Sequence, residues 1–137
     1  MKQKNFRLVW LIIAVMVLAF VPKEVEAQPT VTPEKPLLGD GSDGNPYQIK
    51  TKENLYWFAE QVNNRNLRYA NAILVDNIIV NEDVLNPDGS LKSTNPAEEL
   101  IPWTPIESFG GTYDGQRYTI SGLYCNDTNT NFVGVFS

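Results

Sequence analysis

Residues 47–80, YQIKTKENLYWFAEQVNNRNLRYANAILVDNIIV, pass from a helical period to short β-branched runs, and this change decides the fold class. Four apolar residues in this stretch recur at i, i+3, i+4 and i+7, so they share one helix face: Leu55, Phe58, Ala59 and Val62. Thr51 stands where an N-cap side chain accepts a hydrogen bond from an early backbone N–H. The pattern predicts a helix over about residues 52–64 that packs its apolar face on a core.

Short strands separated by turn residues are expected on the C-terminal side of this helix. Residues 72–75 and 78–80 are β-branched runs, and Asp114-Gly115 indicates a hairpin or a corner between two further strands. A sandwich would need about seven longer alternating strands. Strands of three to five residues between Gly, Asn and Asp corners favour a solenoid instead. We therefore expect a mainly β fold, a parallel β-helix opened by one N-terminal capping helix.

The N-terminal residues have the three parts of a secretory signal. Lys2, Lys4 and Arg7 precede the uncharged run Leu8 to Val21, and a small-residue cleavage pattern ends at Ala27. The run of 14 residues is shorter than the roughly 20 that a membrane span needs. The sequence predicts a signal peptide over residues 1–27, with an uncleaved anchor helix as the alternative.

Two further segments follow the predicted cleavage site. Residues 28–38 hold three prolines without periodicity and are expected to form a Pro-rich linker. Residues 39–137 are expected to form the cap and first turns of the β-helix, incomplete at the C-terminus.

Composition excludes several classes of enzyme. The 137 residues include 11 Lys+Arg, 16 Asp+Glu, one Cys and no His, a formal net charge of −5. Without histidine there is no Ser-His-Asp or Cys-His machinery and no HExxH zinc motif. The acidic balance argues against a nucleic-acid partner. We therefore predict no catalytic residue, no cofactor and no metal, and no membrane association once the signal is cleaved.

Two motifs in the chain match known patterns only formally. Gly39-x-Gly41-x-x-Gly44 has dinucleotide-fingerprint spacing, but Pro36 precedes it and Asn45-Pro46 follows where a helix should open. Asp40 and Asp43 lie in the same segment without EF-hand spacing. A solvated acidic turn is the expected structure here.

Cys125 and the residues after it matter because the chain is predicted to be exported. A lone cysteine in an oxidising compartment either pairs with another chain or is buried as a small hydrophobe, and we expect burial. Asn126-Asp127-Thr128 matches the N-glycosylation pattern, but we expect a chance match because the signal is bacterial in style.

Four stretches together resemble the start of secreted bacterial proteins that carry GLUG-type repeats. They are GDGSDGNPYQIKTKENLYWFAEQVN (39–63), ANAILVDNIIVN (70–81), IPWTPIESFGGTYDGQRYTISGLYCN (101–126) and NFVGVF (131–136). The resemblance implies a right-handed parallel β-helix and an adhesion-like role outside a Gram-negative-type bacterium, at its surface or in its periplasm. Metallopeptidase activity, known among similar proteins, does not carry over because the zinc motif is absent. Glu107 departs from the family, which usually has Gly at this point.

Three functions are compatible with these observations. The first is a non-catalytic secreted or cell-surface adhesion module, part of a larger repeat protein, whose ligand is a glycan or protein on a host or other surface. The second is the N-terminal part of a carbohydrate-acting β-helix enzyme. The third is a truncated remnant without a function of its own.

Candidate residues for these functions can be named from their chemistry. The candidate acids for carbohydrate chemistry are Asp76, Glu82, Asp83 and Asp114, although solvated corners are the more ordinary use of such acids. The candidate aromatics for sugar stacking are Tyr56, Trp57 and Trp103, although packing is their more ordinary use. The long polar loop from Asn81 to Leu100 is the favoured place for a partner. The unpaired C-terminal strand of a β-helix further predicts self-association.

Overall fold

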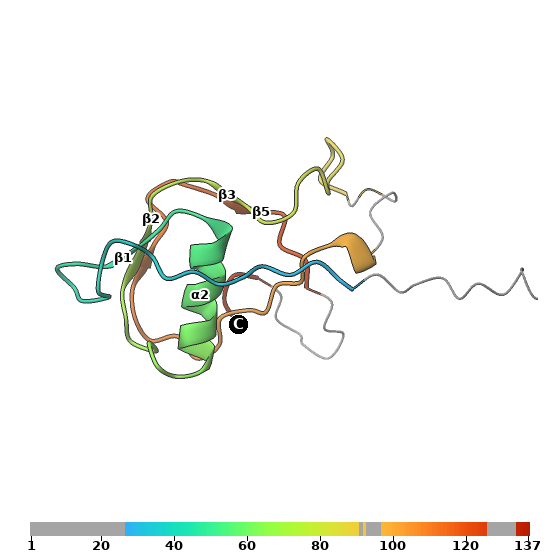
Figure 1. Cartoon of the computed structure of the whole chain (residues 1–137). Helices are drawn as coiled ribbons and strands as arrows, with labels where there is room; N and C mark the ends of the chain where they lie inside the picture. The colour runs from blue at the N-terminus through green and yellow to red at the C-terminus, as the bar shows by residue number, and fades with distance from the viewer. Residues whose placement is uncertain (1–26, 91, 93–96, 126–133) are drawn as a thin grey trace, which may run out of the picture.

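The computed structural model describes residues 27–90, 92, 97–125 and 134–137. These residues form one α-helix, a short 3-10 helix and two small parallel sheets (Figure 1). In chain order the elements are β1 (Tyr47–Ile49), α2 (Lys52–Asn63), β2 (Ala72–Leu74), β3 (Ile78–Ile79), η1 (Ala97–Glu99), β4 (Tyr113–Asp114) and β5 (Ile120–Ser121).

The helix α2 begins and ends as its sequence predicts. The Thr51 side chain accepts a hydrogen bond from the backbone N–H of Asn54 at 3.3 Å, so the N-cap is formed. At the other end Asn64 is the C-cap, and Arg65 follows with a left-handed φ of 64°. The expected apolar face is buried, with Leu55 and Phe58 fully inaccessible to solvent.

The three-stranded sheet has the order β1-β2-β4, and all its pairings are parallel. Tyr47 pairs with Ala72, and Ala72 in turn pairs with Tyr113. Strands β3 and β5 form the second sheet, in which Ile78 pairs with Ile120. Since β4 and β5 both pair with earlier strands, Asp114-Gly115 stands at a corner, and the hairpin alternative is wrong.

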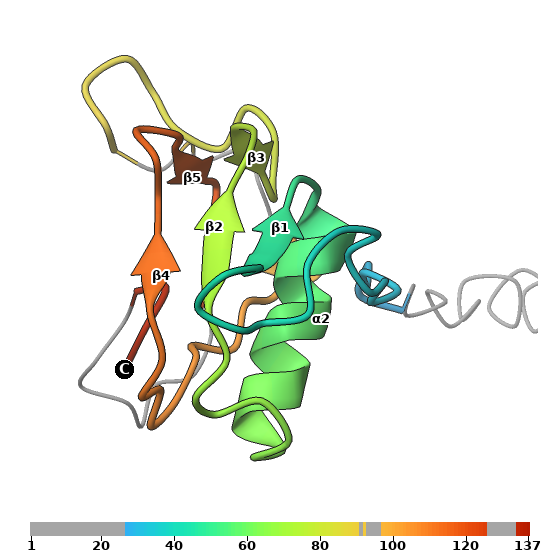
Figure 2. The ribbon, with the colours of Figure 1, turned by 90° about the vertical axis from the view of Figure 1, so that its left-hand side faces the viewer.

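One core joins the helix to the sheets. Figure 2 shows α2 lying alongside the three-stranded sheet. Alternate residues of β1 and β2 are buried towards the helix, while Gln48 and Ile73 on the opposite face are only half-buried. The buried core residues are Tyr47, Ile49, Leu55, Phe58, Ala59, Val62, Ala72, Leu74, Ile78, Val80, Trp103 and Ile106.

The predicted right-handed parallel β-helix is wrong. The described residues form separate sheets of three and two strands, with no closed or solenoid sheet. The helix covers the face of the larger sheet, which in a β-helix would be covered by the other sheets of the same turns. The error has a physical reason: short strands between Asn and Gly corners specify frequent turning, but they do not specify which apolar surface buries the sheet.

Candidate functional site

Residues 34–38 are held against the start of α2 and the outer edge of β1. The backbone N–H of Glu34 donates to the Glu53 carbonyl at 3.1 Å, and Gln48 N–H donates to the Leu38 carbonyl at 3.0 Å. Pro36, between them, is buried. The end of the expected Pro-rich linker is therefore part of the folded domain.

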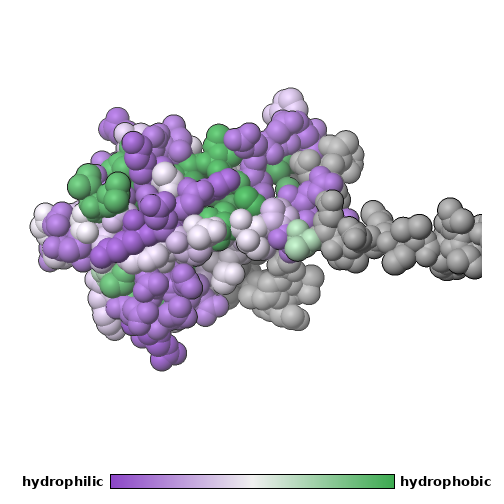
Figure 3. All heavy atoms as spheres, viewed as in Figure 1, coloured by the Kyte–Doolittle hydropathy of each residue, from purple (hydrophilic) through white to green (hydrophobic). Residues whose placement is uncertain are grey.

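Two leucines of this segment are exposed despite the fixed backbone. The side chain of Leu37 is 95% exposed and that of Leu38 is 60% exposed. Figure 3, drawn from the side across which residues 28–38 run, shows green apolar patches set among purple polar residues. Large apolar side chains exposed together are typical of interaction sites.

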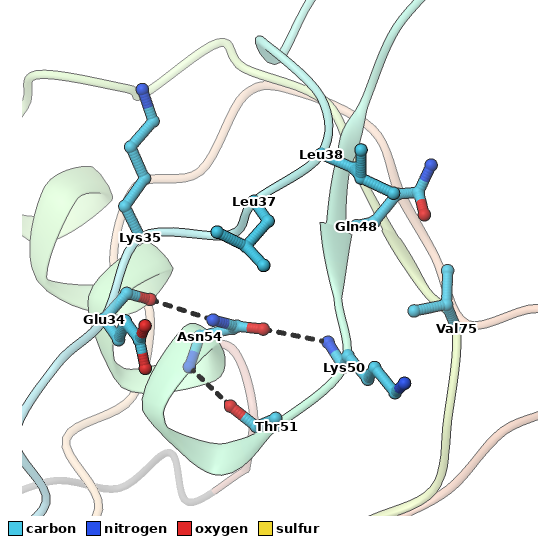
Figure 4. A pocket seen from close by; sticks show the side chains of 9 residues that line it. All are labelled: Glu34, Lys35, Leu37, Leu38, Gln48, Lys50, Thr51, Asn54 and Val75. Carbon is cyan, nitrogen blue, oxygen red and sulfur yellow. Dashed lines mark hydrogen bonds between the residues drawn. The ribbon is translucent and has the colours of Figure 1, made fainter.

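A groove of about 420 Å³ lies beside these leucines (Figure 4). We call it the Leu37 groove. It is lined by Glu34, Lys35, Leu37, Leu38, Gln48, Lys50, Thr51, Asn54 and Val75. The lining therefore comes from three separate parts of the chain: the 34–38 segment, the β1–α2 junction and the end of β2.

Asn54 is the buried polar residue of the groove, and its side-chain amide is satisfied within the protein. Its Nδ2 donates to the Glu34 carbonyl at 3.0 Å, and its Oδ1 accepts from the backbone N–H of Lys50 at 3.3 Å. Figure 4 shows both bonds. Because the amide is used in this way, Asn54 holds two walls of the groove together and is not the group that would bind a ligand.

The two lysines of the groove are placed differently. The Lys35 ammonium lies 5.8 Å from the ring centre of Tyr47 and 6.0 Å from that of Trp57, within cation–π range. Figure 4 shows Lys35 extending away from Leu37, whereas Lys50 extends on the same side as Val75. Lys50 has no ion-pair partner in the part of the chain that the structure describes.

The four candidate acids are all exposed, and three of them make local contacts. Asp76 accepts from the backbone N–H of Asn77 at 2.8 Å, and Asp114 accepts from that of Gln116 at 2.9 Å. Asp83 forms an ion pair with Lys92. The structure therefore gives three of these carboxylates roles in turns or in a surface ion pair. None of the four lines the groove beside Leu37.

The three candidate aromatics belong to the packed interior or its margin. Trp103 is buried, and its indole N–H donates to the Gly134 carbonyl at 3.0 Å. Tyr56 packs edge-on against Trp103, and its hydroxyl donates to the Pro102 carbonyl at 2.8 Å. Trp57 is half-buried and packs edge-on against Tyr47. Trp57 also lies close to a lining residue of the groove, because the Lys35 ammonium is 6.0 Å from its ring centre.

The expected acidic turn is present between Gly39 and Pro46. Asp40 accepts hydrogen bonds from the hydroxyl and the backbone N–H of Ser42, and these bonds lower the pKa of its carboxyl group. Asp43 accepts from Asn71 Nδ2 at 2.6 Å. Both aspartates are thus used to shape the turn and to fasten it to the residue before β2.

Other predicted features are only partly described. The loop from Asn81 to Leu100 is described at residues 81–90, 92 and 97–100, and Asn126-Asp127-Thr128 lies outside the described residues. Cys125 is half-buried, and burial raises the pKa of its thiol. Phe136, in the expected C-terminal strand, forms a parallel bridge with Ile106, and self-association through this strand stays a prediction.

The described residues form neither a cluster of metal ligands nor a helix that could span a membrane. Within residues 27–90, 92, 97–125 and 134–137, no three His, Cys, Asp or Glu side chains gather as a metal site would require. No helix in these same ranges has the length and apolar character to cross a bilayer.

Comparison with protein-family models, curated proteins and solved structures yields no match for this chain. The resemblance to GLUG-repeat proteins therefore stays a prediction from the sequence.

The Leu37 groove was not predicted from the sequence. Its one visible signal is the pair Leu37-Leu38, two apolar residues between a Pro-rich segment and a Gly-rich turn. Most of the other lining residues belong to the strand end and the helix start, where sequence patterns indicate capping and burial.

Proposed function

We propose that this chain provides a non-catalytic binding module of an exported protein, and that it binds its ligand in the Leu37 groove. The observation that carries the proposal is the display of Leu37, 95% exposed, on a backbone held at Glu34 and Leu38. The predicted signal peptide supports the exported location.

The size and lining of the groove suit a small organic ligand. Ligand sites are commonly concave, mostly apolar and about 300–1,000 Å³ in volume, with a few polar groups that orient the ligand. Covering a leucine side chain completely is worth about 1.5–3 kcal/mol. Since hydrogen bonds already fix residues 34–38, a ligand would not have to order them.

We propose that this binding serves an adhesion-like role outside the cell or at its surface. The chain would then be part of a larger protein related to the GLUG-repeat proteins. The contacts of Asp76, Asp83 and Asp114 are local and do not favour the carbohydrate-acting alternative.

Protein-observed NMR tests the proposal. The ¹⁵N-labelled protein purified after export is titrated with three probes that share an aliphatic chain: 1-octanol, n-octanoate and n-octylammonium. We expect at least one probe to shift the amide signals of Leu38, Gln48 and Lys50. Leu37→Ser should weaken that binding at least about fivefold, since one exposed aliphatic contact is lost.

A matched control tests whether loss of binding is specific to the groove or follows from removing any exposed leucine. Leu85 is 48% exposed on a different loop, so Leu85→Ser should leave binding unchanged. The proposal fails if no probe shifts the groove amides, or if Leu37→Ser binds as well as the unsubstituted protein.

A further inference from the structure

We infer that the ligand of the Leu37 groove is an aliphatic anion, whose negative head group pairs with Lys50. This inference rests on the proposed function and adds the chemical class of the ligand. Three features of the groove support an aliphatic anion: the charge of its lining, its hydrogen-bond donors and the position of its apolar wall.

The lining carries a positive excess in an acidic protein. Two lysines and one glutamate line the groove, whereas the whole chain has a formal net charge of −5. Lys35 is engaged with the rings of Tyr47 and Trp57, which leaves Lys50 as the lysine free to meet a ligand. Figure 4 places the carboxylate of Glu34 apart from the Lys50 ammonium, so an anion beside Lys50 is not forced against Glu34.

Two other lining residues, Gln48 and Thr51, also carry hydrogen-bond donors. The Thr51 side-chain oxygen accepts from the N–H of Asn54, so its hydroxyl proton stays available to a ligand. The Gln48 side chain also lines the groove and can donate through its amide. An ammonium, a hydroxyl and an amide on neighbouring residues suit a carboxylate or phosphate oxygen better than a cation.

The apolar wall lies within reach of the same head-group position. Leu37, Leu38 and Val75 line the groove together with Lys50, and Val75 and Lys50 occupy one side of it in Figure 4. The aliphatic chain of a ligand can therefore pack on Leu37 and Leu38 while its anionic head group pairs with the solvent-exposed Lys50. The amide of Asn54 is already satisfied, so no buried polar group needs a partner beneath the chain.

The three octyl probes test this inference because they differ only in the head group. We expect n-octanoate to bind about two- to fivefold more tightly than 1-octanol, the size of a surface ion pair, and n-octylammonium to bind most weakly. Lys50→Gln should bring the octanoate affinity to that of 1-octanol. For the unsubstituted protein, raising the ionic strength from 20 to 300 mM should reduce the difference in affinity between n-octanoate and 1-octanol, because exposed charges are screened.

Lys52→Gln is the matched control, since this neighbouring lysine does not line the groove and the change removes the same charge. It should keep the preference for octanoate. The thermal midpoints of both variants should equal that of the unsubstituted protein, which shows that any loss is not unfolding.

The outcomes distinguish the two proposals. If 1-octanol binds as tightly as octanoate and only Leu37→Ser matters, the anion inference is wrong and the proposed function stands. If Lys50→Gln keeps the preference for octanoate, the assignment of Lys50 is wrong. If no probe binds, both proposals fail.

Discussion

Asparagine side chains supply many of the hydrogen bonds between segments that are distant in the sequence. Asn71 accepts from the backbone N–H of Thr112 at 2.8 Å, and Asn77 accepts from that of Thr119 at 2.9 Å. Asparagine was expected at corners because of its backbone tolerance. The structure adds that its side chain also joins one corner to the next.

Asn81 makes the largest set of these contacts and is buried. Its Nδ2 donates to the carbonyls of Ile101 and Gly122 at 3.0 and 2.8 Å, and its Oδ1 accepts from the N–H of Ile101 at 2.8 Å. Gly122 approaches so closely, with φ of +70°, that an added Cβ would lie 2.1 Å from the Asn81 carbonyl oxygen. The positive φ and this close backbone contact both require glycine at position 122.

Replacing this side chain should leave three partner groups without their hydrogen bonds. We predict that Asn81→Ala lowers the free energy of unfolding by about 2–4 kcal/mol, since unsatisfied buried groups cost about 1–3 kcal/mol each and relaxation recovers part. Urea unfolding measures the change. Asn66→Ala, which removes an exposed side chain, should stay within about 0.5 kcal/mol. Equal effects of the two substitutions would contradict the prediction.

At the scale of elements, the apolar face of α2 packs against both edge strands of the three-stranded sheet. The ring of Phe58 lies 5.8 Å from those of Phe109 and Tyr113, and 6.4 Å from that of Tyr47. One helical residue thus contacts strands at both edges of the three-stranded sheet. The sheet has strands of only two or three residues, so the helix supplies much of its cohesion.

We therefore predict that Phe58→Asp unfolds the protein. The substitution loses about 1.5–3 kcal/mol of apolar burial and adds the several kcal/mol of desolvating a carboxylate. Small domains have only about 5–15 kcal/mol of stability. Circular dichroism should show loss of the helix signal and of a cooperative melt. Phe58→Leu should keep the helix signal and the cooperative melt, with a lower melting midpoint. An unchanged melting midpoint for Phe58→Asp would rule the prediction out.

At the scale of the whole molecule, two partly buried tyrosines make stability depend on alkaline pH. Burial, with a smaller contribution from Cys125, raises the pKa of Tyr56 to about 12, and burial also raises the pKa of Tyr113. Tyr56 donates to the Pro102 carbonyl, a contact that its ionised form cannot make. The neutral forms of both tyrosines therefore belong to the folded state.

The sign of the pH effect follows from linkage. Below pH 10 both states hold the phenol proton, and the stabilisation is complete. Between about pH 10 and pH 12 the unfolded chain releases protons that the folded protein keeps, so the free energy of unfolding falls. We predict that the free energy of unfolding falls less steeply with pH for Tyr56→Phe than for the unsubstituted protein. Urea unfolding from pH 8 to 11.5 measures both. Tyr69→Phe, at an exposed site, should follow the unsubstituted curve, and equal slopes for all three proteins would refute the assignment.

The sequence by itself determined the local elements: the helix over residues 52–63, its buried face, the N-cap at Thr51 and the short strands between Asn and Gly corners. These depend on periodicity and on side chains that bond to backbone nearby, so neighbouring residues encode them. Only the tertiary structure decided that α2 covers a three-stranded parallel sheet and that residues 34–38 lie beside β1 and Val75 to form a groove. Such placement depends on which distant apolar surfaces bury one another, and a local pattern is compatible with more than one such pairing.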